Sequence, residues 1–318
     1  MAVVYNRPGQ ANAAGDELAL FLKKFSGEVL TAFLRKVVMN KGRVLTRSLR
    51  GAKQAQFPAT WRTTAQYFVP GVSDPLEGAN GVKHGERVIA LDYPLLTDIF
   101  IAEWDEIVNH YDIRGIYSTM QGEALAVSHD ETVMRVFGLA ARASDLFGGD
   151  GFTGEEIVNA NAASNGETLA ALIFDAAQAL DEKDIPEDTR TAYMKPAPYY
   201  LLAQTTKVIN KDWGGAGVYA DGKVLRVAGI ELVKTNRVPS TNLASNPTGV
   251  NPPNDYTGDF TNTVVVGGHP SAAGVVKAMD VSTQMKWRIE HQAHQLVSKL
   301  MVGSGILRPE AAFEIKTA

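Results

Sequence analysis

Residues 54–93 are predicted to form a long β-hairpin that cannot be stable by itself. Residues 60–69 are rich in Thr, Trp, Tyr, Phe and Val, and residues 87–93 alternate apolar and polar side chains, which is typical of strands. The segment between them contains the turn dipeptides Pro-Gly, Asp-Pro and Asn-Gly. An isolated two-stranded hairpin is only marginally stable in water, and no helix follows closely enough to cover both faces. The hairpin is therefore expected to lie on another body, such as a second subunit.

An amphipathic helix is predicted to begin near Asp16, inside a strongly basic N-terminal segment. Its apolar residues recur at roughly helical spacing: Leu18, Leu20, Phe21, Leu22, Phe25, Val29, Leu30 and Phe33. Residues 1–63 hold eleven Lys and Arg against three acidic residues, a net charge of +8, and the overall charge of −4 leaves −12 for the rest of the chain. A basic arm on an acidic body indicates attraction to an acidic partner, to nucleic acid or to a second copy, with a solvated basic face as the alternative.

Residues 98–143 are predicted to form one long helical region. Trp104, Ile107 and Val108 share one helical stripe there. The sequence Ser-His-Asp-Glu at residues 128–131 is a capping-box pattern, which predicts that the helix restarts near residue 129.

The rest of the chain is predicted to alternate helices and strands. Ser164 or Asn165, together with Glu167, is expected to begin a helix that continues through Leu180. The other expectations are a strand pair at 223–233 bent at Gly229, a long polar loop at 236–262, strands at 264–266 and 275–279, and an amphipathic helix or long strand at 284–301.

The composition is that of an ordinary globular chain. At 318 residues, with 45% hydrophobic and 21% charged residues, the chain can form one large domain or two modest ones. It has no cysteine, which excludes disulfides, thiolate catalysis, Fe–S clusters and cysteine-ligated zinc. We find no apolar run long enough for a membrane span and no secretion-signal pattern, so synthesis in the cytoplasm is expected.

The candidate chemical motifs each have a simpler interpretation. His291 and His294 could share a helix face and bind a metal, but no third ligand lies at a matched spacing, and interface or surface histidines are favoured. The glycine-rich residues 214–217 lack the strand–loop–helix context of a phosphate site and indicate a flexible loop. Trp61 beside Arg62 could stack at a subunit contact, with ordinary packing as the alternative. We predict no catalytic, cofactor-binding or metal-binding residue.

Several passages, in order along the chain, resemble the major capsid proteins of short-tailed double-stranded-DNA bacteriophages. They are residues 13–23 (AAGDELALFLK), 27–33 (GEVLTAF), 56–58 (QFP), Tyr67 with Pro70-Gly71, 110–114 (HYDIR), 122–126 (GEALA) and 307–312 (LRPEAA). The resemblance is dense over residues 13–126 and the last dozen, and thin over 145–275.

The resemblance implies an α+β fold, the Hong Kong 97-type fold of tailed-phage and herpesvirus major capsid proteins. In that scheme residues 1–50 form an N-terminal arm and 51–97 an extended loop. Residues 98–144 and 279–318 form a peripheral domain with a long spine helix, and 145–278 form an axial domain.

The implied function is structural. The chain would self-assemble into hexamers and pentamers of an icosahedral shell enclosing the phage DNA, first as a precursor that expands on maturation. The partners implied are other copies of the chain, a scaffolding protein, a portal at one vertex and packaged DNA at the inner surface, without a membrane or cofactor. Bistability for expansion is expected in the arm and in a bent helix near residue 128.

Eight residues are candidate inter-subunit contacts: Leu18, Phe21, Phe25, Phe33, Trp61, Arg62, Tyr67 and Lys83. Lys83 is the one lysine of the tip segment 70–86, and shells without covalent cross-links are expected. Two alternatives stay open: a bacterial nanocompartment shell of the same fold, and a metal- or nucleotide-dependent enzyme using His291, His294 and residues 214–217.

Overall fold

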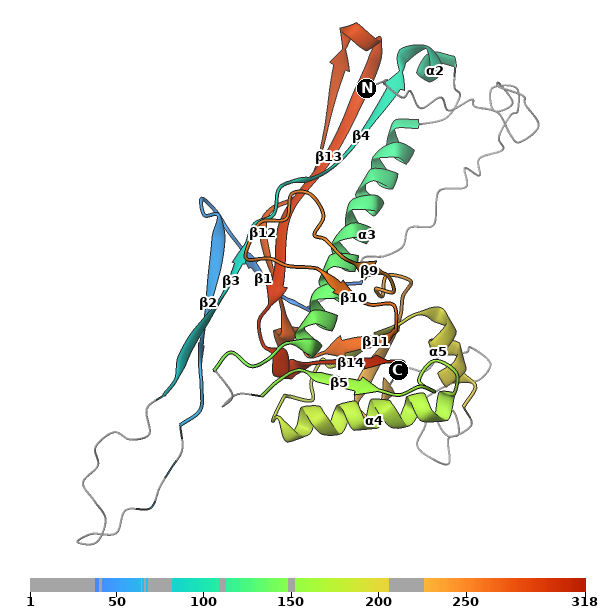
Figure 1. Cartoon of the computed structure of the whole chain (residues 1–318). Coiled ribbons are helices and arrows are strands. Elements are labelled where there is room, and N and C mark those ends of the chain that lie inside the picture. Colours follow the sequence, from blue (N-terminus) through green and yellow to red (C-terminus); the bar gives the residue numbers. More distant parts are fainter. Residues whose placement is uncertain are drawn as a thin grey trace.

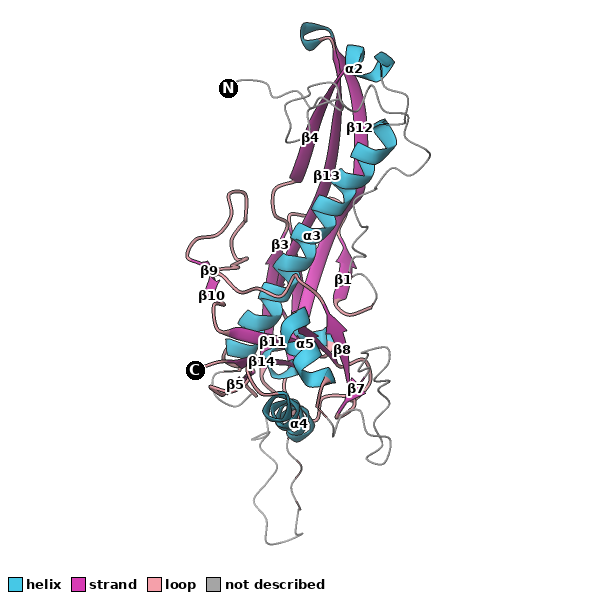
Figure 2. Cartoon of the chain, turned by 90° about the vertical axis from the view of Figure 1, so that its right-hand side faces the viewer, coloured by secondary structure: helices cyan, strands magenta, loops and turns pink. Residues whose placement is uncertain are grey.

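A long helix lies along an elongated four-stranded sheet (Figures 1 and 2). The computed structural model describes residues 38–39, 42–63, 65, 67, 82–108, 113–147, 152–205 and 226–318. The helix is α3 (Ile113–Arg142), and the sheet has the order β1 (Leu45–Ser48), β12 (Ala273–Arg288), β13 (Ala293–Ile306), β4 (Leu95–Ala102). None of the described helices has the length and hydropathy needed to cross a membrane.

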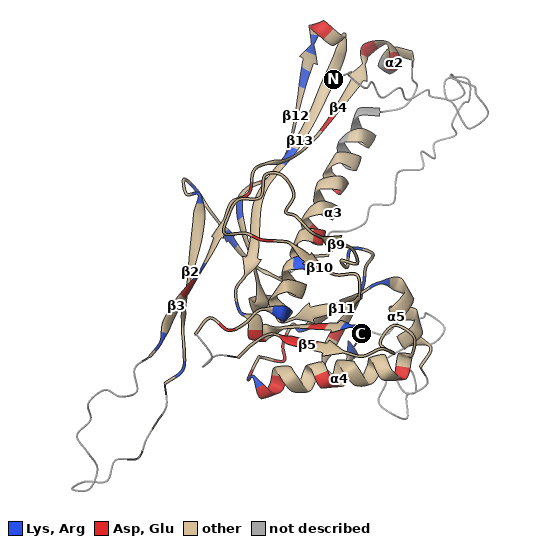
Figure 3. Ribbon diagram, in the orientation of Figure 1, with Lys and Arg blue, Asp and Glu red and all other residues tan. Residues whose placement is uncertain are grey.

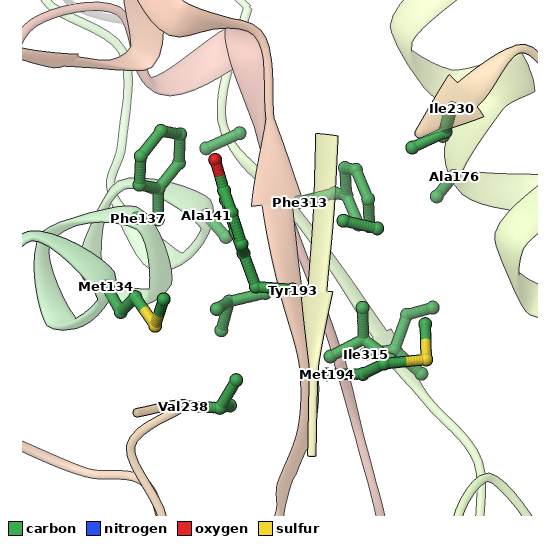
Figure 4. Packing of buried hydrophobic residues seen from close by; sticks show 14 of the residues in the cluster. Met134, Phe137, Ala141, Ala176, Tyr193, Met194, Ile230, Val238, Phe313 and Ile315 are labelled. Atoms are coloured by element: carbon green, nitrogen blue, oxygen red, sulfur yellow. The ribbon is translucent and has the colours of Figure 1, made fainter. Parts of the chain in front are cut away.

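A second, compact body is formed by a six-stranded sheet. Its order is β5 (Glu155–Val158), β14 (Ala312–Lys316), β11 (Thr263–Gly268), β6 (Thr191–Met194), β8 (Ile230–Lys234), β7 (Arg226–Val227), with helices α4 (Gly166–Glu182) and α5 (Pro196–Ala203) packed beside it. Every residue of β6 and β11 is buried, as expected for central strands covered on both faces. Figure 4 shows the core between this sheet and the last turns of α3, where the rings of Phe137 and Tyr193 lie 6.0 Å apart.

The predicted hairpin is present, and it projects from the body (Figure 1). It consists of β2 (Gln54–Thr60) and β3 (His84–Ala90), paired antiparallel from Gln54 opposite Ala90 to Thr60 opposite His84. β2 contains Pro58, which has no backbone N–H to donate. Leu91 N donates to Lys53 O and Trp61 N donates to Lys83 O, so the hydrogen bonds between the two strands fall on the odd-numbered residues of β2. The backbone nitrogen of Pro58 therefore points away from β3, and the pairing is not disturbed. Burial is limited to the base, where Ala55 and Ile89 pack on the body.

Two expectations for residues 98–143 are wrong. Residues 98–102 belong to strand β4, where Ala102 pairs with Ala293, and only Glu103–Val108 forms a short helix, α2. α3 then runs unbroken through residues 128–131, so there is no restart near residue 129 and no helix bend there of the kind expected for bistability. The apparent cap has another role, because Asp130 is fully buried and binds groups far away in the sequence.

Several local predictions are confirmed. The Asn165 side chain caps α4 by accepting from Glu167 N and Thr168 N. Gly229, with φ of +76°, turns the chain between β7 and β8. Of the two alternatives for residues 284–301, the strand is observed on both sides of a turn, since β12 and β13 form one hairpin around the 3₁₀ turn Ile289–His291.

The polar segment 236–262 is mostly irregular chain. It includes the short pair β9 (Asn242–Leu243) and β10 (Gly258–Asp259). Two further 3₁₀ turns lie at Pro270–Ala272 and Pro309–Ala311. Residues 214–217, expected to form a flexible loop, lie outside the described residues.

Candidate assembly surfaces

The first candidate surface is the part of the hairpin next to the body. Trp61 packs inside its own chain, with its ring 5.1 Å from Phe147 and 5.7 Å from Phe152. The Arg62 guanidinium lies 5.7 Å from the Phe152 ring and donates to Asp184 at 2.7 Å. Both residues were expected to contact a neighbouring subunit. In the structure they have partners within their own chain, and these contacts connect the hairpin to the body.

A cavity of about 350 Å³ lies between this part of the hairpin and the body. Its walls include Phe57 and Arg87 from the hairpin and Phe147, Phe152 and Leu307 from the body. The Nε of Arg87 is buried without an acceptor among the described residues. The cavity is partly open to solvent, so this stretch of the hairpin is not packed continuously against the body.

The other candidate contact residues fall into two groups. Tyr67 is fully exposed and Lys83 is exposed, both beyond the paired strands of the hairpin. The four arm residues, Leu18, Phe21, Phe25 and Phe33, lie outside the described residues.

A second surface, at the far end of the four-stranded sheet, was missed by the sequence analysis. Trp104, Ile107 and Ile289 are 70%, 72% and 71% exposed, an unusual exposure for large apolar side chains. α2 and the β12–β13 turn adjoin there, since Glu103 N donates to Gln292 O at 3.2 Å. The sequence analysis placed Trp104 and Ile107 on the apolar stripe of a long helix. The β-branched residues of segment 95–102 are the signal for a strand that ends just before them, and this signal could have shown that they lie at the end of a sheet.

Two buried ion pairs fix α3 in the body. Asp130 accepts from the Arg237 guanidinium, and both side chains are almost fully buried. At the end of the helix, Arg142 donates to both oxygens of Glu314 at 2.6 and 2.7 Å, and this bond raises the pKa of Arg142. Glu314 is itself fully buried and also accepts from Thr263 Oγ1 at 2.5 Å.

The acidic body expected from the charge balance is visible in Figure 3, with Asp and Glu along α4 and around α2. Some basic residues of the first 63 already have partners. Arg43 pairs with Glu231 at 2.7 Å, and Arg47 donates to Gln56 O at 3.0 Å. Arg43 thus attaches the chain that follows the arm to the body, and Arg47 attaches it to strand β2 of the hairpin.

His129 is a buried titratable group on the sheet-facing side of α3. It borders a cavity of about 240 Å³ whose walls also include Lys277, Asp280 and Leu300. Burial, aided by the charge of Lys277, lowers the pKa of His129 to about 4. Its Nδ1 has no hydrogen-bond partner among the described residues.

The unassembled subunit is expected to lose stability as the pH falls from about 6.5 to 4, in part through His129. The unfolded histidine takes up a proton near pH 6.5, whereas the folded one resists protonation down to about 4. The unfolded state therefore binds more protons in this window, and the loss is on the order of 3 kcal/mol. Urea unfolding across the window should show a smaller loss for His129→Gln than for the wild type, with exposed His84→Gln as the control. The same pH dependence in all three proteins would contradict this assignment.

The two histidines considered as metal ligands do not belong to a metal-binding cluster among the described residues. Groups of three or more His, Cys, Asp or Glu that could hold a metal are absent from the described part of the chain. His291 and His294 lie at the β12–β13 turn and not on a helix, with their rings against Phe100 (5.4 Å) and Trp287 (4.8 Å).

A long helix against an elongated sheet, a compact second sheet and a projecting hairpin define the chain as a capsid subunit of the tailed-phage type. The chain from the capsid structure of cyanophage P-SCSP1u superposes with a TM-score of 0.83 at 37% identity, covering 100% of this chain and 99% of that one. The asymmetric unit of the bacteriophage PhiM1 mature capsid gives a TM-score of 0.75 at 21% identity, over 98% and 96% of the two chains, and supports the fold alone.

Residues 56–316 match the family described as Gp10A-like, major capsid protein. The major capsid protein of Escherichia phage T7 is 32% identical over 320 residues, which is 94% of this chain and 92% of the relative. The major capsid protein of Enterobacteria phage T3 is 31% identical over 327 residues, 96% and 93% of the two chains. The chain belongs to the Gp10A-like major capsid protein family. Its relatives are structural capsid proteins and not enzymes, which removes the enzyme alternative.

Proposed function

We infer that this protein is the structural subunit of a bacteriophage capsid shell and assembles with copies of itself. The observation that carries this inference is the amount of apolar and extended structure that the single chain leaves uncovered. The hairpin projects beyond its small base cluster, Tyr67 on it is fully exposed, and Trp104 and Ile107 are exposed at the far tip. Large apolar side chains exposed at the ends of projecting elements indicate protein contacts, and the family supplies the partner, a second copy.

The domain scheme remains a proposal. Residues 1–50 would be the N-terminal arm, 51–97 the extended loop, 98–144 and 279–318 the peripheral domain and 145–278 the axial domain. Sheet pairing suggests one refinement, since β14 pairs with β11 and β5 and would therefore belong with the axial body.

The finer features of the shell are also proposed. Hexamers and pentamers would form an icosahedral shell around double-stranded DNA, held non-specifically at the inner surface. Assembly in the host cytoplasm would use a scaffolding protein and a portal at one vertex, and the precursor would expand on maturation. Expansion requires two packings of similar free energy, and the arm is the element that we assign to the change.

Electron microscopy of the purified protein tests the proposal directly. Closed particles of uniform size are expected, either from the protein alone or after co-expression with a scaffolding protein. Particles that contain nucleic acid support a genome shell, whereas particles that enclose a protein cargo would favour the nanocompartment alternative. A uniform small oligomer under all these conditions would contradict shell assembly.

Tyr67 and Trp61 are expected to respond differently to replacement by Ala. Tyr67 makes no large contact at home, so Tyr67→Ala should leave the unfolding free energy of the subunit within about 0.5 kcal/mol of the wild type while lowering the denaturant midpoint of shell dissociation. Trp61→Ala removes the contacts with Phe147 and Phe152 and should destabilise both subunit and shell, by about 1–3 kcal/mol in the subunit. A shell unaffected by Tyr67→Ala would show that this residue is not an inter-subunit anchor.

A further inference from the structure

The polar segment 236–262 is firmly attached where it passes the root of the hairpin. We define the hairpin root as residues 90–93, where β3 rejoins the body. Four residues of the segment, Asn251, Asn254, Tyr256 and Gly249, bond to this root. Asn254 and Tyr256 are 6% and 3% exposed, although the segment around them is largely polar.

The first attachment is at the outer edge of β3. Leu91 N donates to Lys53 O, so the alternate residue Ala90 turns its own N–H and C=O away from β2. The Asn254 side chain meets both groups: its Oδ1 accepts from Ala90 N at 3.1 Å and its Nδ2 donates to Ala90 O at 2.8 Å. The amide thus acts like one residue of an additional strand. Loss of the Asn254 amide would leave the buried N–H and C=O of Ala90 without hydrogen-bond partners, which would destabilise the folded subunit.

The second attachment is a partly buried network around Asp92. Its carboxylate accepts from Asn251 N at 3.0 Å, from Asn254 Nδ2 at 3.0 Å and from the Tyr256 hydroxyl at 2.6 Å. Burial, reinforced by the charge of Asp92, raises the pKa of Tyr256 far above its ordinary value. The hydroxyl therefore stays protonated and acts as the hydrogen-bond donor to Asp92.

The third attachment is to β13 on the other side. Asp92 N donates to Val302 O at 3.2 Å, and Ser304 N donates to the Tyr256 hydroxyl at 3.0 Å. Gly303 lies between these residues, and a Cβ added to it would come within 1.8 Å of Ala90 O. The close backbone contact between β13 and the root therefore requires glycine at this position.

The hairpin is held much less tightly beyond its root. From Phe57 to Trp61 it rests on aromatic rings above a cavity of about 350 Å³, and Arg62 adds only an exposed ion pair with Asp184. Exposed ion pairs contribute little to stability. Because the hairpin is held firmly at residues 90–93 and weakly farther out, any movement of the hairpin occurs on the far side of these residues.

We propose that residues 249–256 form a clamp, with Asn254 as its positioning residue, that fixes the direction in which the hairpin leaves the body for a neighbouring subunit. This inference rests on the proposed assembly function, because the direction matters only if the hairpin reaches a second copy. The clamp makes the root a fixed base, so any swing of the hairpin during assembly occurs beyond the root, where β2 and β3 lie over the cavity.

Hydrogen–deuterium exchange on the unassembled full-length subunit tests the clamp. Asn254→Leu should speed exchange of the β2 and β3 amides by about tenfold or more, because the root loses the bonds that hold it closed. Exchange in the central strand β11 should stay as in the wild type. Asn242→Leu is the matched control, an exposed asparagine of the same polar segment, and should change neither region. If Asn254→Leu does not fold, Tyr256→Phe retains the ring, removes the hydroxyl and should speed exchange of the same strands by a smaller factor.

The assembly readout separates the clamp from the function on which it rests. Shells from Asn254→Leu should form at a clearly lower yield than shells from Asn242→Leu. Unchanged exchange in β2 and β3 overturns the clamp, and faster exchange with a normal shell yield overturns its role in positioning. If the wild type itself forms no shells, the proposed function fails, while the exchange comparison still decides whether the clamp exists.

Discussion

Removal of residues 1–35 is expected to abolish shell assembly while leaving a folded, soluble subunit. The removed segment carries the apolar stripe from Leu18 to Phe33, together with four of the eleven Lys and Arg residues of the first 63 and all three of their acidic residues. The stripe would be buried against a neighbour, and Lys23 and Lys24 within it would add charge attraction. The body should survive, because Val38 and Met39, whose amides bond to Asp130 at 2.9 and 3.4 Å, are retained. Circular dichroism would report the fold, and electron microscopy with sedimentation would report assembly.

Three further variants separate the contributions of the arm. Deletion of residues 1–12 removes chain but none of the stripe, and shells should still form. Phe21→Ser with Phe25→Ser should block assembly at all salt concentrations, whereas Lys23→Gln with Lys24→Gln should weaken it most at low salt, where charges are least screened. Normal closed shells from the protein lacking residues 1–35 would show that the arm is not an assembly element.

Replacement of Asp130 by Asn is expected to destabilise the subunit by about 3–5 kcal/mol, because Arg237 stays buried after losing the charge of its partner. The same carboxylate holds Val38 and Met39, so the variant also weakens the anchor at the exit of the arm. Urea unfolding of the unassembled subunit measures the loss. The neighbouring Glu131→Gln is the control, because its ion pair with Arg135 is partly exposed and should change stability by about 0.5 kcal/mol at most.

A double variant decides whether charge burial is the cause. Asp130→Asn combined with Arg237→Met leaves no uncompensated charge, so a large part of the lost stability should return. If the double variant is less stable than Asp130→Asn alone, the uncompensated charge of Arg237 is not the cause of the lost stability.

Features coded over a few neighbouring residues were predictable from the sequence. The cap at Asn165, the turn at Gly229 and the strands after residue 262 follow from short patterns that act locally. The hairpin was predictable as a unit that cannot bury itself, although its strands are displaced toward its ends: β2 ends at Thr60, where the first strand was expected to begin, and β3 overlaps the expected 87–93 only over residues 87–90. The family was also recognisable, because its motifs keep their order along the chain.

Features that depend on distant partners were decided only by the tertiary structure. Residues 128–131 carry a capping pattern, yet Asp130 binds Arg237, which is 107 positions away, and the helix continues. Trp104 has the spacing of a buried helix stripe, but pairing of β4 with β13 ends the sheet just before it and leaves it exposed. The polar segment 236–262 has a composition typical of a loose loop, and its order arises from Asp92 and Ser304, which no local pattern connects to it. A short sequence pattern specifies what a residue can do, whereas the groups that desolvate it or bond to it come from the rest of the folded chain.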